Sequence, residues 1–174
     1  MRADRYYPGF RQGKRGLQWY PDDFVPSGLP LETGRIWYVD GDKAASGAGA
    51  SWSDAFKTIQ EAETAASAGD VALVAARTMA ATDTDPTNYA ETITVNTPQF
   101  SIIGVSRGLT QGGLPQVKIG AGSTAMLTIQ APGCLIANLG FNGGSSTGGG
   151  ILIDDDGGST KSVFGFTVSN CHFK

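Results

Sequence analysis

The feature that most constrains the fold is a short pattern that occurs twice near the end of the sequence. Residues 137–141 (ANLGF) match residues 169–173 (SNCHF) at an interval of 32 residues. Repetition at a fixed interval indicates similar units that stack along one axis. We therefore expect Asn138 and Asn170 to lie above each other at a turn and to pair their side-chain amides as a ladder.

Short apolar segments separated by Gly, Pro and Asn surround this repeat, and 25 of the 174 residues are glycine. This composition suits tight turns between short strands. The pattern predicts coils of roughly 20–25 residues with inward-facing stacks, and the Gly/Ser-rich segment 143–150 accounts for the longer interval of 32. A β sandwich gives similar strands and remains the alternative. The predicted strands are 92–95, 100–105, 116–119, 126–129, 135–141, 151–153 and 163–173, after a side loop at 78–88.

A strand, a short helix and a second strand are predicted before these coils. Residues 36–39 (IWYV) are β-branched or aromatic, as is typical of a strand. Ser51 or Ser53 is expected to cap the helix, with Asp54 near its positive end, and Gly69 is expected to end it before a strand from Val71. The apolar face of the helix is predicted to consist of Phe56, Ile59, Ala62 and Ala66.

The same region carries a resemblance to a known group of proteins. Residues 38–75, YVDGDKAASGAGASWSDAFKTIQEAETAASAGDVALVA, are similar to the N-terminal part of single-stranded right-handed parallel β-helix proteins, the pectate-lyase-like group. Many bacteriophage tailspike and fibre proteins belong to that group. The resemblance implies an all-β solenoid with a short N-terminal capping helix, and it also implies a homotrimer. Its most specific part is 51–76.

Three regions follow from these patterns. Residues 1–35 form an extended, basic and aromatic arm, residues 36–76 comprise the first strand, the capping helix and the first coil strand, and residues 77–174 form the coils. Nothing polar or helical follows the last predicted strand, and an uncovered solenoid end is prone to aggregation. We therefore expect either that the coils continue beyond Lys174 or that a partner covers this end.

The arm differs from the rest of the chain in charge. Residues 1–20 carry a net charge of +4, while the remainder carries −7. Aromatic side chains and Arg are typical of interface anchors, so the arm is predicted to dock on other proteins. An arm folded back on its own domain and a nucleic-acid-binding arm are the alternatives, although no nucleic-acid-binding module accompanies it. The predicted contact residues are Arg2, Arg5, Tyr6, Tyr7, Phe10, Arg11, Lys14, Arg15, Trp19 and Tyr20.

The acidic residues give no recognisable catalytic arrangement. The run 154–156 and the pair Asp40 and Asp42 are interpreted as turns, with a Ca²⁺ site as the alternative for each. A glycosidase would need two facing carboxylates, for which 83, 85 and 91 are the candidates, but spacing alone does not show a pair. We predict no catalytic residue, no metal site and no cofactor.

The remaining candidate groups are equally isolated. The cations that a lyase would require are Arg77, Arg107, Lys118, Lys161 and Lys174, and they follow no known motif. The single histidine, His172, has no triad partners, and the glycines at 143–150 lack the Lys of a phosphate loop. Cys134 and Cys171 lie in strand patterns and are predicted to be buried free thiols.

The arm and the lack of a catalytic set favour a structural protein, and the resemblance implies that it is a virion protein of a bacteriophage: a tailspike, a fibre or a capsid-attached protein. The arm would dock on capsid, portal or tail proteins, and the β-helix would project toward the host surface, where polysaccharide is a candidate ligand. No apolar signal segment precedes the arm, so synthesis in the host cytoplasm and location in the virion are expected, without a membrane partner. The alternative is a polysaccharide lyase or glycoside hydrolase whose catalytic coils lie outside this segment. A third reading, a bacterial carbohydrate-binding surface protein, is disfavoured by the lack of an export signal.

Overall fold

The computed structural model describes the backbone of residues 10–13 and 16–19, and residues 34–79, 87–105, 113–118, 125–143, 149–155 and 162–174. The chain divides into two compact units, residues 1–32 and residues 33–174. The first unit contains an antiparallel hairpin of β1 (Phe10–Gly13) and β2 (Gly16–Trp19). This hairpin differs from the unpaired extended arm that the sequence suggested.

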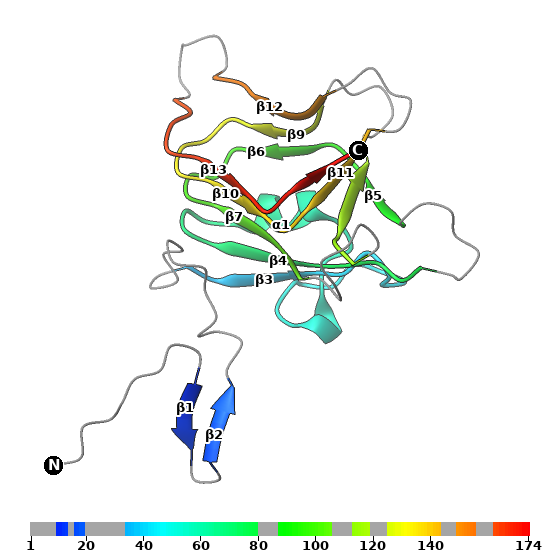
Figure 1. Ribbon diagram of the computed structural model, residues 1–174, viewed down its shortest axis with the longest axis vertical. Coiled ribbons are helices and arrows are strands. Elements are labelled where there is room, and N and C mark those ends of the chain that lie inside the picture. The colour runs from blue at the N-terminus through cyan, green and yellow to red at the C-terminus, as the bar shows by residue number, and fades with distance from the viewer. Residues whose placement is uncertain are drawn as a thin grey trace, which may run out of the picture. The chain divides into compact units, whose positions relative to one another are not determined.

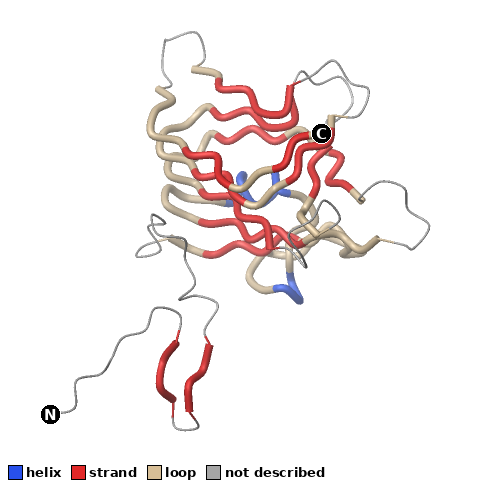
Figure 2. Tube along the Cα trace, viewed as in Figure 1, coloured by secondary structure: helices blue, strands red, loops and turns tan. Residues whose placement is uncertain are grey.

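The second unit is a parallel β-solenoid of about three turns. Each turn contributes one strand to each of three sides, so strands far apart in sequence lie beside each other (Figure 1). Sheet B has the order β13-β10-β7-β4-β3, sheet C the order β14-β11-β8-β5 and sheet D the order β12-β9-β6. Figure 2 shows the strands of the three sides joined by loops at the corners.

The strands are short, and every pair within the solenoid is parallel. Sheet B consists of β3 (Ile36–Val39), β4 (Val71–Ala75), β7 (Ser101–Val105), β10 (Leu135–Ala137) and β13 (Thr167–Ser169). Sheet C consists of β5 (Asn88–Ala90), β8 (Gln116–Lys118), β11 (Gly140–Asn142) and β14 (His172–Phe173). Sheet D consists of β6 (Ile93–Val95), β9 (Ala125–Ile129) and β12 (Gly149–Ile153).

The predicted repeat is confirmed by the strand register. Leu135 pairs with Thr167, which is the interval of 32 residues found in the sequence. The amide of Asn170 donates a hydrogen bond of 2.7 Å to the side-chain oxygen of Asn138, so the predicted ladder is present. Successive turns along sheet B are 35, 30, 34 and 32 residues long, which exceeds the expected 20–25 because the connections between strands are longer.

The corners explain where the predicted long strands are interrupted. Asn138 and Asn170 have positive φ angles of 56° and 49°, a backbone conformation that Asn tolerates better than most residues. This turn divides 135–141 into β10 and β11, and the turn at Asn170 separates β13 from β14 within 163–173. Gly104 lies within β7 at the register position of Asn138, where an added Cβ would collide with the Asn138 carbonyl oxygen.

The core lies between the three sheets, where side chains of successive turns stack along the axis. In sheet B the register partners Ala72, Ile102 and Ile136 are all fully buried. In sheet C, Phe141 is buried below Phe173, with ring centroids 5.1 Å apart. Burial of such side chains contributes roughly 1.5–3 kcal/mol each, which makes these stacks the main stabilising element of the solenoid.

One short helix, α1 (Ile59–Ala65), precedes β4, and a 3₁₀ turn, η2 (Trp52–Asp54), precedes the helix. The helix begins later than predicted. Its N-cap is Thr58, whereas Ser51 precedes the 3₁₀ turn and makes no side-chain cap, so the predicted Ser51 or Ser53 cap is wrong. Ile59 and Ala62 are buried as predicted, but Phe56 precedes the helix and forms a parallel bridge with Val39.

The end of the helix also differs from the prediction. Ala66 is its C-terminal cap, and Gly69, with a φ of 88°, lies in the following turn. Residues with positive φ recur at this corner, two positions before each later strand of sheet B. They are Gly69, Gln99, Gly133 and Gly165.

Candidate functional site

The ten predicted contact residues of the arm belong to the first unit. Phe10, Arg11 and Trp19 lie in the hairpin, and the register makes Phe10 and Trp19 partners. Two aromatic residues of the predicted contact set are therefore brought to opposing positions. The other seven lie outside the described residues: Arg2, Arg5, Tyr6, Tyr7, Lys14, Arg15 and Tyr20.

The first turn of α1 is fixed by a reciprocal pair of hydrogen bonds. The Thr58 hydroxyl accepts from the Glu61 amide at 3.2 Å, and the Glu61 carboxylate accepts from the Thr58 amide at 2.9 Å. This capping box satisfies amides that have no partner within the helix. Burial opposes ionisation of Glu61, but hydrogen bonds from Thr58 and neighbouring residues outweigh it and lower the pKa of Glu61.

Two side chains of α1 bind the backbone of β6, the first strand of sheet D, and of the two residues that follow this strand. The Gln60 side-chain oxygen accepts from the Thr94 amide at 2.7 Å, and the Gln60 amide group donates to the Thr94 carbonyl at 3.4 Å. The buried Glu63 carboxylate accepts from the amides of Asn96 and Thr97 at 2.8 and 3.1 Å. The helix therefore supplies β6 with polar partners on the side where no further strand lies.

A side chain that lies two residues before β6 also binds the backbone of the helix. The Glu91 carboxylate accepts from the amides of Ile59 and Gln60, both at 3.0 Å. Burial raises the pKa of Glu91, although these two hydrogen bonds act against the rise. The nearby Glu61 carboxylate adds to this rise, and the Glu91 carboxylate is held by the amides of the helix N-terminus.

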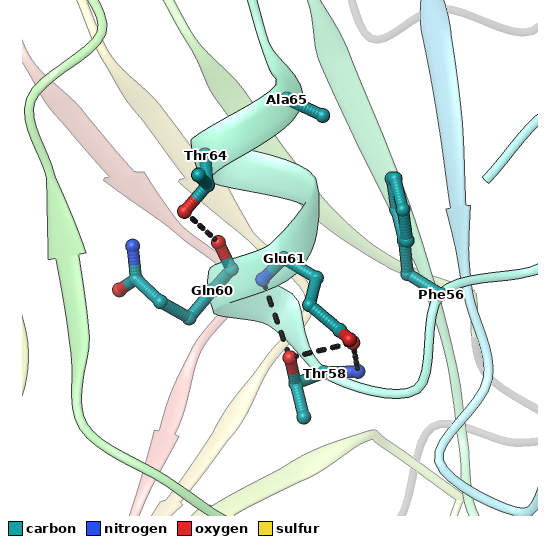
Figure 3. A pocket seen from close by; sticks show the side chains of 6 residues that line it. All are labelled: Phe56, Thr58, Gln60, Glu61, Thr64 and Ala65. Carbon is teal, nitrogen blue, oxygen red and sulfur yellow. Dashed lines mark hydrogen bonds between the residues drawn. The ribbon is translucent and has the colours of Figure 1, made fainter. Parts of the chain in front are cut away.

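An open groove of about 320 Å³ lies along the outer side of α1. Figure 3 shows the Phe56 ring on one side of the helix and the capping box of Thr58 and Glu61 at its base. Thr64 donates to the Gln60 carbonyl at 2.8 Å, so its hydroxyl is already used. The lining residues are Phe56, Thr58, Gln60, Glu61, Thr64 and Ala65. Glu61 is the ionisable group among them, and its carboxylate already accepts the hydrogen bonds of the capping box.

Asp40 and Asp42 make turns, as the sequence suggested. The Asp42 amide donates to the Asp40 carboxylate at 3.1 Å, which is the hydrogen bond of an Asx turn. Asp42 then accepts from the Thr78 amide and pairs with Arg77 at 3.1 Å. Burial opposes ionisation of Asp42, but these contacts with Thr78 and Arg77 prevail and lower its pKa.

Arg77 and Tyr89 connect this turn to the first coil. Arg77 donates to the Asn88 carbonyl at 2.8 Å. The Tyr89 hydroxyl accepts from the Gly41 amide at 3.0 Å and donates to the Ala75 carbonyl at 2.7 Å, and burial raises its pKa. Arg77 is thus held in a structural network with Asp42 and the Asn88 carbonyl.

Other sequence candidates lie apart from each other. Asp154 follows β12 and accepts from the Gln130 amide at 2.8 Å, and His172 lies exposed in β14. Within the described residues no group of three or more His, Cys, Asp or Glu side chains could hold a metal ion. Candidates outside the described residues are Asp83, Asp85, Arg107, Asp156 and Lys161.

Both cysteines are free, as predicted. Cys134 is buried and Cys171 is half-buried, so the second is less enclosed than expected. Burial raises the pKa of both thiols, which keeps them in the unreactive protonated form.

The last turn leaves core positions uncovered. Val168 continues the stack of Ile136 but is 39% exposed, and Phe173 is 55% exposed although its partner Phe141 is buried. Ile153, which follows Ile129 in sheet D, is 48% exposed. Each side of the solenoid therefore ends in an exposed apolar residue.

Comparison with protein-family models, curated proteins and solved structures finds no match to this chain. The parallel solenoid is established by its strand register, and the specific relationship to pectate-lyase-like or phage proteins remains a proposal. Among the described helices none is long and apolar enough to cross a membrane.

Sequence reasoning missed the residues that join α1 to β6. Thr58 and Glu61 form a T-x-x-E pattern directly before an apolar helical face, which is a recognisable capping-box signal. Gln60, Glu63 and Glu91 carry no such signal, because their partners are backbone amides 31 to 34 residues away. Their role can be recognised only in the folded structure, where the first turn of the solenoid brings α1 beside β6.

Proposed function

We propose that this chain is a structural protein of a bacteriophage particle, of the tailspike, fibre or capsid-attached type. Its N-terminal arm docks on capsid, portal or tail proteins, and its solenoid, right-handed like nearly all parallel crossover connections, projects toward the host surface. Copies assemble as a homotrimer, and host polysaccharide is a candidate ligand.

The observation that carries this proposal is the division of the chain into two units, the first of which begins with a basic segment. Residues 1–32 form a unit of their own that contains the hairpin, and within it residues 1–20 carry +4, whereas residues 33–174 carry −4. An isolated two-stranded hairpin is at best marginally stable in water, so it gains most from a partner. Its aromatic and Arg content is that of an interface anchor.

Within this proposal, α1 is the cap of the solenoid. An uncovered first turn would present unpaired strand edges and invite aggregation. The Gln60 side-chain oxygen accepts from the backbone of β6, and Glu63 accepts from the amide of Asn96 directly after this strand. Ile59 and Ala62 cover the core with buried apolar surface. Capping at the N-terminal end suits a module that connects to a particle through the preceding arm.

The test is co-sedimentation with purified phage particles that lack this protein. The intact chain is compared with a chain that starts at Thr33, the first residue of the solenoid unit. The proposal predicts that only the intact chain sediments with particles. Sedimentation of both chains would place docking on the solenoid, and sedimentation of neither would remove the virion assignment.

A further inference from the structure

One buried carboxylate holds the segment that leads from the first unit into the solenoid. Asp70, in the corner between α1 and β4, is only 5% exposed. It accepts hydrogen bonds from the Arg35 amide at 2.7 Å, the Trp37 indole nitrogen at 2.9 Å and the Ser67 amide at 2.8 Å. Burial opposes ionisation of Asp70, but the hydrogen bonds from these donors prevail and lower its pKa. The donors therefore bind a charged acceptor, which makes their hydrogen bonds stronger than neutral ones.

Backbone packing strengthens the hold on the same segment. The Val71 amide donates to the Arg35 carbonyl at 2.9 Å. Gly34 lies so close to Gly69 that an added Cβ would collide with the Gly69 carbonyl oxygen. The Arg35 guanidinium lies 4.0 Å from the centroid of the Trp37 ring, a distance suited to a cation–π contact. We call this junction, residues 34–37 held by the corner 67–70, the Asp70 clamp.

The corner is in turn tied to the next turn of the solenoid. The Ser101 amide donates to the Asp70 carbonyl at 3.0 Å, and the Gly69 amide donates to the Pro98 carbonyl at 3.2 Å. A continuous set of contacts thus runs from Arg35 through Asp70 to β7. Strand β3, by contrast, has four residues and is the outermost strand of sheet B, beside β4 (Figure 1). Because terminal elements open at the lowest free energy, β3 would open first if nothing held it.

We propose that the Asp70 clamp is a mechanical device that transmits a pulling force on the N-terminal arm to the second turn of the solenoid. The inference rests on the proposed function, in which the particle holds the arm while the solenoid contacts the host. A force between the two units passes through Gly34 and Arg35, because the chain enters the solenoid there. The loop at 49–56 pairs with the other side of β3, but it belongs to the same first turn and would be released with the strand. The clamp instead spreads the force over β3, the corner and β7.

The test is constant-force unfolding of the full chain in optical tweezers. One handle is attached to the N-terminus and the other to an azide-bearing amino acid in place of Lys118, which is exposed at the end of β8. Asp70→Asn keeps the size of the side chain and removes its charge. Glu63→Gln is the matched control, because Glu63 is also a buried carboxylate that accepts from backbone amides, but it follows β3 along the chain. Circular dichroism verifies that each variant is folded.

We expect β3 to open faster in Asp70→Asn than in the parent chain at the same force, by roughly tenfold or more. This factor corresponds to the loss of one hydrogen bond to a charged acceptor. Glu63→Gln should open β3 at the parental rate, because its contacts break only after β3 has been released. An unchanged rate in Asp70→Asn, or an equal increase in Glu63→Gln, overturns the inference.

Native-state hydrogen exchange of the parent chain decides the question if Asp70→Asn does not fold. The clamp predicts that the Arg35 amide and the Trp37 indole hydrogen exchange as slowly as the amides of β7. Exchange of both hydrogens roughly tenfold faster than that of β7, or more, would mean that the segment opens by itself, and it overturns the inference. Neither experiment uses particles, so a failed clamp is distinguished from failed docking, which co-sedimentation measures.

Discussion

Replacement of Glu63 by Ala tests whether α1 supports the edge of β6 through specific hydrogen bonds. The Glu63 carboxylate is buried and accepts from the Asn96 amide at 2.8 Å and from the Thr97 amide and hydroxyl at 3.1 Å. Hydrogen bonds to a charged acceptor contribute about 1.5–3 kcal/mol each, and water can replace part of the loss. We expect Glu63→Ala to reduce the free energy of unfolding by about 2–4 kcal/mol.

The matched control is Glu61→Ala, because it makes the same chemical change on the same helix. Glu61 bonds to Thr58 and Lys57 at the start of its own helix and to Ser46 in the preceding loop. Its loss removes the capping box and should cost about 1 kcal/mol. Equilibrium unfolding in urea, followed by circular dichroism, measures both values. A Glu63→Ala variant within about 0.5 kcal/mol of the parent chain, or a Glu61→Ala variant that loses as much as Glu63→Ala, would refute the reasoning.

Three further perturbations test other parts of the fold. Ile59→Ala empties a fully buried position under the helix and should destabilise by about 2–5 kcal/mol in the same unfolding assay, whereas a near-parental value would mean that the helix does not cover the core. Burial raises the pKa of Glu91 above its ordinary value of 4.5, so the folded state binds the proton more tightly than the unfolded state. The stability of the parent chain relative to Glu91→Gln should therefore fall as pH rises through and above that value, and a flat difference would contradict the raised pKa. Asn138→Ala loses both the amide contact with Asn170 and a side chain that tolerates positive φ, so it should reduce stability by about 1–3 kcal/mol. Asn138→Gly should cost less, because Gly adopts positive φ without strain. If thermal melting gives the reverse order, the positive φ at this position is not what requires Asn.

The repetitive part of this fold could be predicted from the sequence, because it depends on local periodicity. The match between 137–141 and 169–173 predicted both the register of β10 with β13 and the stacking of Asn138 on Asn170. The strands at Ile36–Val39 and from Val71 followed from runs of β-branched and aromatic residues. In each case the information lies within a few neighbouring residues.

Features that depend on distant partners were not predictable in the same way. Strand β5 (Asn88–Ala90) was not predicted: the side loop extended to Asn88 and the next strand began at Thr92. Its three residues become a strand only by pairing with β8. The helix start was placed too early, because Trp52–Asp54 form a separate 3₁₀ turn. In this turn the Asp54 amide donates to the Ser51 carbonyl, and the Asp54 carbonyl accepts from the Gly49 amide.

The docking role of the arm is tested most directly by site-specific photo-crosslinking to the particle. A photoreactive phenylalanine analogue replaces Phe10 in the hairpin, or Phe173 in the last turn of the solenoid as the control. Each protein is bound to purified particles and irradiated, and the adducts are identified by mass spectrometry. The proposed function predicts an adduct between position 10 and a capsid, portal or tail protein, and none from position 173. Adducts from position 173 alone, or none from position 10 on particles that carry the bound protein, would contradict it.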